Sequence, residues 1–328
     1  MAPPDLVIHR ATTAVTIATT GAMVTFTVTR ADGGVMDPLF RPHWTQAPGD
    51  PLLGHMRGDF LCVPFGMQPD PQRLPEPWRA HAGSPTAWPH GYAAAHEWQV
   101  VAATDSRAHL ALKYPQEDDV ASVTCLVVAL EDGIEVTDTI TVRRAARLPL
   151  GLHPILRLPT EVGAARLVLP GARSLRTQPV PPEPSSLLKA GAVFHDLAAA
   201  PLAAGGTDDL THLPLAGARE EIILIDSPAE PLIRLINEAE RYEVSVEWDA
   251  RHLRSCMLWV SNRGRPFAPW DGRNTCLGVE PVTAAFDYGT AISRADNPLT
   301  QDGIATTATI SPARPVVLRH RIRVTPLP

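Results

Sequence analysis

Proline is spread along the whole of this chain and occupies 34 of its 328 positions. Its ring fixes φ and removes a backbone donor, so it is poorly tolerated inside helices and central strands. A chain this rich in proline is unsuited to long helices. We therefore expect many short elements joined by ordered loops.

Alternation of apolar and polar residues with a period of two dominates the remaining sequence. Residues 22–30 place Val24 and Phe26 between threonines, as in a half-buried strand. The clearest hairpin joins residues 121–130 to residues 134–142 through an Asp-Gly turn. Further strands are expected at residues 6–10, 13–19, 107–113, 166–169, 221–226, 231–236, 243–248, 255–261 and 316–325.

Three segments, residues 40–92, 178–207 and 262–282, break this pattern and are rich in proline and glycine. Long irregular segments in a compact β domain are commonly functional loops. We expect little regular structure in them beyond a short helix at residues 194–200.

The number of short strands predicts an all-β fold, a large antiparallel β-sandwich. A β-propeller is the main alternative, but it should show a repeat of roughly 40–50 residues, and the sequence has none. No shift in composition marks a linker. We therefore expect one domain over residues 1–328.

Bulk properties narrow the range of partners. The formal net charge is -6 and no basic face is indicated, so nucleic acid is not an expected partner. The sequence contains no run of 18 apolar residues, so no membrane span is predicted, and the N-terminus lacks a signal-peptide pattern. A soluble cytoplasmic protein is the expectation. The four cysteines and twelve histidines show no metal-ligand spacing, so neither a metal nor a cofactor is expected.

Three short clusters set ionisable residues beside glycine, proline and apolar neighbours. They lie at residues 90–92, 151–154 and 278–283. A partly buried carboxyl or imidazole group in such a setting suits proton transfer near neutral pH. The plainer alternatives are that Glu280 pairs with an arginine at a strand end and that His153 is a core histidine bonded to a carbonyl.

Taken in order, these clusters resemble segments of the aldose 1-epimerases and hexose-6-phosphate mutarotases. Residues 90–93 resemble the family's HGFAR segment, and residues 151–154 resemble the start of its GLHPYF segment. Residues 277–281 are similar to its LGxEP segment. The order and rough spacing hold from about residue 55 to 290.

The resemblance implies a galactose mutarotase-like supersandwich whose open face binds a sugar. Carried over by motif, Glu280 would be the general base on the C1 hydroxyl and His153 the general acid on the ring oxygen. His90 would hydrogen-bond the ring oxygen or its neighbour. Arg57 and Asp208 would hold sugar hydroxyls.

Tryptophans suggest where a sugar could stack. Trp270 lies in a Pro/Gly-rich loop and is expected to line the pocket, whereas Trp259 lies in an apolar strand and is expected in the core. Two departures from the family bear on the substrate. Ala94 replaces the arginine of the HGFAR segment, and in the sugar-phosphate branch such arginines help hold the phosphate. Met67 stands where another arginine often follows the family's Pro-x-Gly. A phosphosugar is therefore not expected.

The predicted activity is that of an isomerase that interconverts sugar anomers by opening and closing the ring. Each acid–base group resets after one turnover, so the reaction needs no cofactor. The alternative is a non-catalytic carbohydrate-binding or sugar-sensing protein on the same fold, since Ile155-Leu156 replace the family's aromatic pair. A polysaccharide lyase or glycoside hydrolase is disfavoured by the lack of helical sequence.

Overall fold

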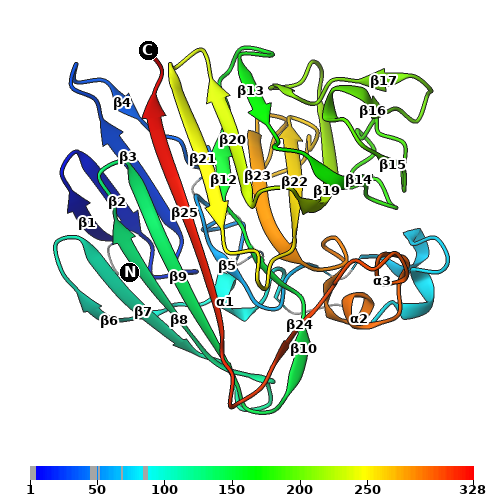
Figure 1. Cartoon of the computed structure of the whole chain (residues 1–328), viewed down its shortest axis with the longest axis horizontal. Coiled ribbons are helices and arrows are strands. Elements are labelled where there is room, and N and C mark those ends of the chain that lie inside the picture. Colours follow the sequence, from blue (N-terminus) through cyan, green and yellow to red (C-terminus); the bar gives the residue numbers. More distant parts are fainter. Residues whose placement is uncertain (1–4, 45–49, 51, 68, 84–87) are drawn as a thin grey trace.

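The computed structural model describes residues 5–44, 50, 52–67, 69–83 and 88–328. Two large antiparallel sheets dominate it (Figure 1). The larger has nine strands, in the order β18 (His212–Leu213), β13 (Ala165–Val168), β20 (Leu232–Asn237), β21 (Tyr242–Trp248), β25 (Val316–Pro326), β9 (Gly133–Val142), β8 (Val120–Ala129), β7 (Arg107–Lys113) and β6 (Gln99–Ala103).

The second sheet has eight strands and carries the candidate site. Its order is β15 (Val193–Phe194), β14 (Ala172–Thr177), β19 (Arg219–Pro228), β22 (Ser255–Asn262), β23 (Thr275–Thr283), β11 (Leu150–Leu152) and β5 (Leu61–Cys62), with β12 (Ile155–Arg157) also paired to β23.

Smaller elements complete the chain. An N-terminal sheet contains β1 (Leu6–Arg10), β2 (Thr13–Ile17), β3 (Val24–Thr29) and β4 (Val35–Met36). Two-stranded pairs join β10 (Ala146–Leu148) to β24 (Ala308–Ile310) and β16 (Ala200–Pro201) to β17 (Thr207–Asp208). The described helices are α1 (Tyr92–Ala95), α2 (Gly289–Arg294), α3 (Pro298–Gln301) and three 3₁₀ turns at Pro71–Arg73, Arg79–His81 and Leu197–Ala199.

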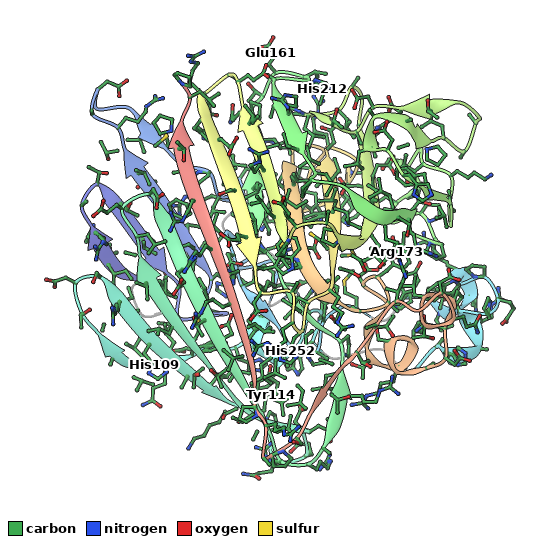
Figure 2. The ribbon with its side chains drawn as sticks, in the orientation of Figure 1. His109, Tyr114, Glu161, Arg173, His212 and His252 are labelled. Carbon is green, nitrogen blue, oxygen red and sulfur yellow. The ribbon has the colours of Figure 1, made fainter. Side chains whose placement is uncertain are left out.

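Alternation along the strands divides the eight-stranded sheet into two faces. Ile223, Leu258 and Val279 belong to the main core, together with apolar side chains of the nine-stranded sheet. Their chain neighbours Ile222 and Met257 belong to a second apolar cluster under the loops that cover the other face. Figure 2 shows side chains filling the space between the ribbons, with Glu161 and His212 at the same outer end of the molecule.

The predicted all-β, antiparallel class is confirmed, and most of the predicted strands are present. Among the described residues, no helix is long and apolar enough to cross a membrane.

Two local predictions differ from the structure. The helix predicted at residues 194–200 is a single 3₁₀ turn, Leu197–Ala199, between two short strands. The end of the segment predicted to be irregular, residues 262–282, contains the central strand β23. Gly278 and Pro281 favour an irregular segment over a central strand. Pro281, however, lies where the partner of β23 changes from β12 to β11. β23 pairs with β22 continuously through Pro281 and Cys256, but the Val279 N–H, two residues earlier, donates to the Pro154 carbonyl on the opposite side. Alternate residues of a strand face the same neighbour, so the Pro281 nitrogen faces the gap between β12 and β11, and its missing N–H interrupts neither ladder.

Candidate active site

His153 and Glu280 are brought together by strand register. Gly151 pairs with Val282 and Ile155 pairs with Gly278, so His153 falls opposite Glu280 between the two pairings. Residues directly opposed on antiparallel strands project to the same face of a sheet. The result is a distance of 3.7 Å from His153 Nε2 to Glu280 Oε1, with both side chains buried.

Glycines on both strands make room for the pair. A Cβ at Gly278 would lie 2.7 Å from Glu280 Oε1, so only glycine leaves the carboxyl group its position. A Cβ at Gly151 would lie 2.3 Å from the ring of Phe65. The two glycines of the sequence motifs thus make space for the site rather than forming turns.

The His153 ring is fixed from several sides. The Phe60 ring stacks on it at 4.6 Å with an interplanar angle of 16°, and the His153 backbone N–H donates to the Phe60 carbonyl at 2.9 Å. The His90 ring meets it edge-on at 5.1 Å. His153 therefore has little freedom to reorient.

His90 reaches the site from a strained turn. Its φ is +58°, in the left-handed region, and Gly91 follows at +92°. A Cβ at Gly91 would lie 2.1 Å from the Val63 carbonyl oxygen, so a larger residue there would displace the turn. The His90 backbone N–H donates to the Gly66 carbonyl at 2.9 Å, which secures the turn against the neighbouring loop.

A cavity of about 250 Å³ opens above the pair. Its walls are mainly apolar and aromatic, with a small set of ionisable groups, which is the usual make-up of a small-molecule site. The lining residues are Asp50, Leu52, Leu53, Met56, Met67, Pro89, His90, His153, Glu183, Ile222, Met257, Trp259, Arg265, Phe267, Trp270, Glu280 and Asp287.

Burial controls the charges in this cavity. It raises the pKa of Glu280 well above its ordinary value, and the nearby Asp287 carboxylate raises it further. Burial also lowers the pKa of His153, with a smaller contribution from His90, and it lowers the pKa of His90 to about 4. In the free protein, these effects favour uncharged forms of all three side chains.

Polar atoms at the site lack partners within the described part of the chain. They are His90 Nδ1, His153 Nδ1 and Glu280 Oε2, all buried. Buried polar atoms are almost always hydrogen-bonded, so unsatisfied ones call for an explanation. A ligand carrying several hydroxyl groups would supply the missing bonds.

Two tryptophans form one wall. Trp270 lines the cavity and meets Trp259 edge-on at 5.9 Å. Trp259 is buried, as predicted, but it also lines the cavity, and its Nε1 donates to Glu220 at 3.1 Å. The Arg265 guanidinium lies 4.7 Å from the centre of the Trp270 ring.

Arg57 and Asp208 do not line this cavity. Arg57 pairs with Asp5 at 2.9 Å, and Asp208 pairs with the buried Arg219 at 2.7 Å. Both carry predicted sugar-binding roles that rest on the resemblance alone. The geometry gives each of them a different partner.

Four ionisable residues of the cavity were not predicted: Asp50, Glu183, Arg265 and Asp287. Arg265 pairs with Glu183 at 2.9 Å and approaches Glu220 at 3.8 Å. Asp287 accepts a hydrogen bond from Gln178 at 2.5 Å, and burial raises its pKa to about 6. Arg265 stands between a glycine and a proline in a segment predicted to be functional, which is the one signal that could have identified it.

Comparison with known proteins gives a consistent fold. No family model matches the chain, and no curated protein matches it by sequence. Among solved structures, a candidate aldose 1-epimerase from Escherichia coli K12 superposes with a TM-score of 0.68 at 17% identity, covering 98% of this chain and 99% of that one. The Slr1438 protein of Synechocystis sp. PCC 6803 gives 0.68 at 16% identity, covering 99% and 96%.

A galactose mutarotase related enzyme from Lactobacillus acidophilus gives a TM-score of 0.64 at 14% identity, covering 98% of this chain and 97% of that one. Sequence identities this low indicate a shared fold but not a shared activity. The whole described chain, from its N-terminal sheet to β25, has the galactose mutarotase-like fold.

Proposed function

We propose that this protein interconverts the anomers of a sugar by general acid–base catalysis, with Glu280 as base and His153 as acid. The observation that carries the proposal is the approach of Glu280 Oε1 and His153 Nε2 to 3.7 Å over one cavity. The two oxygens that exchange protons in mutarotation are bonded to the same carbon, so the two groups must act within one sugar ring.

The proton balance closes within the pair. Glu280 takes the proton of the C1 hydroxyl as the C1 carbonyl forms and the bond from C1 to the ring oxygen breaks. His153 gives its proton to that oxygen. Rotation about C1–C2 and the reverse transfers then close the ring on the other face. The pair holds one proton before and after each step, so no outside acid, base or redox partner is needed.

The environment suits this exchange. The uncharged pair and the carboxylate–imidazolium pair contain the same number of protons, and moving one proton between the groups converts one form to the other. Burial favours the uncharged form. A sugar hydroxyl that donates to Glu280 would favour the carboxylate, which is the form that acts as base. His90, whose pKa lies near 4, would remain neutral and hydrogen-bond the sugar.

NMR exchange spectroscopy or polarimetry on a panel of aldoses tests the proposal. The wild-type protein should accelerate anomer exchange of at least one aldose, and Glu280→Gln should abolish most of that acceleration. Sugar binding without any acceleration would instead identify a carbohydrate-binding protein on the same fold. Equal exchange rates with wild type, variant and buffer would reject the enzymatic function.

A further inference from the structure

A second chamber of about 210 Å³ adjoins the cavity that holds His153 and Glu280. The two spaces share Met67, Glu183, Ile222, Arg265 and Asp287 in their walls, so they lie directly beside each other. None of the three residues at the reacting end (His90, His153 and Glu280) lines the second chamber. A group that binds there would lie beside the reacting end without touching these three residues.

The relative sizes of the two spaces set the scale of the ligand. The second chamber is nearly as large as the first, at about 210 Å³ beside about 250 Å³. If the first accepts one sugar ring, then the second has room for a group of similar bulk. A single substituent such as a hydroxymethyl group would leave most of it to water.

Gln178 gives the second chamber a built polar contact. Its side chain is 5% exposed, and its Nε2 donates to Asp287 Oδ1 at 2.5 Å. That bond uses one of the two amide N–H donors, and Oε1 is a buried acceptor with no partner in the described chain. A buried free acceptor in a cleft wall calls for a ligand that donates, such as a hydroxyl group.

The charges of the chamber argue against an anionic ligand. Three carboxyl groups, of Asp70, Glu183 and Asp287, line it beside two guanidinium groups, of Arg73 and Arg265. Arg265 is already paired with Glu183 at 2.9 Å, and Arg73 donates to the Pro181 carbonyl at 2.9 Å. A phosphate or carboxylate can only accept hydrogen bonds, so it would face three carboxyl groups, and only Arg73 of the two arginines has no carboxylate partner among the described residues.

We propose that this second chamber binds the non-reducing unit of a neutral reducing disaccharide or longer saccharide, with Gln178 as a hydroxyl-binding residue. The orientation of the saccharide rests on the proposed function, because the reducing ring must lie over His153 and Glu280. The substrate class is therefore an uncharged saccharide of at least two units with a free anomeric carbon.

Kinetics on paired sugars test the chamber. Anomer exchange is measured for maltose, cellobiose and lactose, and for glucose, galactose and glucose 6-phosphate. At least one disaccharide should show a kcat/KM roughly tenfold above that of its reducing-end monosaccharide, the gain of one or two buried hydrogen bonds. Equal values for every disaccharide and its monosaccharide, or the highest value for glucose 6-phosphate, would overturn the proposal.

A variant assigns the effect to Gln178. Gln178→Leu should lower the disaccharide-to-monosaccharide ratio of kcat/KM by about tenfold, because the buried acceptor is lost. Gln178→Ala removes the same amide without adding an apolar group, and it is used if the leucine variant fails to fold. Gln99→Leu, at an exposed position on β6, is the matched control and should leave the ratio unchanged. An unchanged ratio in both Gln178 variants would reject the role of Gln178.

Calorimetry separates this proposal from the proposed function. If no sugar is turned over but a disaccharide binds about tenfold more tightly than its reducing-end monosaccharide, then the catalytic proposal fails and the second chamber stands. If turnover occurs and the two sugars bind and react equally well, then the chamber proposal fails and the catalytic proposal stands.

Discussion

Two buried histidine–carboxylate pairs sit in different parts of this molecule. In the cavity, His153 and Glu280 are 3.7 Å apart, whereas in the core His320 of β25 bonds Asp59 at 2.7 Å. Burial lowers the pKa of His153, and His90 lowers it further. Burial also acts to lower the pKa of His320, but the charge and hydrogen bond of Asp59 more than offset it, so that pKa is raised.

The surroundings of the core pair explain the difference. Asp138, on the neighbouring strand β9, also attracts a charge on His320, and Glu135 on the same strand acts in the same direction. Burial raises the pKa of Asp138 to about 7, opposed by His320 and supported by Asp59. The core thus favours a charged histidine that is bonded to Asp59 and attracted by Asp138. At the cavity pair, burial favours the uncharged forms of both groups, and the Asp287 carboxylate raises the pKa of Glu280 further.

The largest expected effect breaks the cavity pair. Glu280→Gln keeps the shape of the side chain but cannot accept the proton, so kcat/KM for anomer exchange should fall by about 10²–10⁴-fold. The melting temperature should change little, because burial already favours the neutral carboxyl group. The measurements are NMR exchange and thermal unfolding. A fully active variant would remove Glu280 from the mechanism.

Breaking the core pair of Asp59 and His320 should lower the stability of the fold, unlike the loss of Glu280. Asp59→Asn leaves His320 buried without its anionic partner, so the free energy of unfolding should fall by about 3 kcal/mol in a denaturant titration near pH 6. Asp5→Asn, which breaks the more exposed pair with Arg57, is the control and should cost under about 1 kcal/mol. Equal losses of unfolding free energy in the two variants would show that the core pair stabilises the fold no more than the exposed pair does.

The two histidines should also titrate apart. In an NMR pH titration, the His320 imidazole should hold its proton above pH 6.5, and the His153 imidazole should stay neutral below it.

A raised histidine pKa gives stability that is present below the unfolded value and is lost as pH rises through the folded value. The raised pKa of Asp138 acts in the same direction, over the range from 3.8 to about 7.

Replacing His320 separates these contributions. Wild type should lose more free energy of unfolding than His320→Gln as the pH is raised from about 6 to about 9, since the variant has no imidazole to deprotonate. His153 contributes the opposite slope, because its lowered pKa destabilises the fold only as pH falls below 6.5. Parallel curves for the two proteins would contradict the assigned direction for His320.

The smallest effect concerns the space around Glu280. Gly278→Ala would place a methyl group 2.7 Å from Glu280 Oε1 and 3.1 Å from Trp259 Cβ. The carboxyl group must shift, so kcat/KM should fall by roughly tenfold and the free energy of unfolding by about 1–3 kcal/mol. Unchanged kinetics would mean that the carboxyl group has a second position from which it still serves the reaction.

The sequence predicted the class of fold and the two central residues for definite reasons. The alternation of apolar and polar residues in a strand shows which of its faces is buried. The motifs around His153 and Glu280 are each one short, continuous stretch of sequence, so they can be identified directly. Both residues lie together in the structure as the resemblance implied. His90 and Trp270 also line the cavity.

The positions of other residues could not be predicted from the sequence, because they depend on the path of the chain. Arg265 and Asp287 reach the cavity from loops whose course is set by packing, so their local sequences carry little information about position. Arg57 and Asp208 stand in weakly matching segments and meet Asp5 and Arg219 instead. Strand β23 was partly assigned to a loop, because glycine and proline usually disfavour central strands.

The break between β11 and β12 has a consequence for redesign. His153 faces Glu280 because the same pairing frame holds on both sides of the break, from Gly151 to Ile155. Adding or deleting one residue there would turn the imidazole toward the opposite surface of the sheet or force one of the flanking strands to slip. The covering loops can change in length without altering this pairing, but the spacing between residues 151 and 155 must be preserved for His153 to face Glu280.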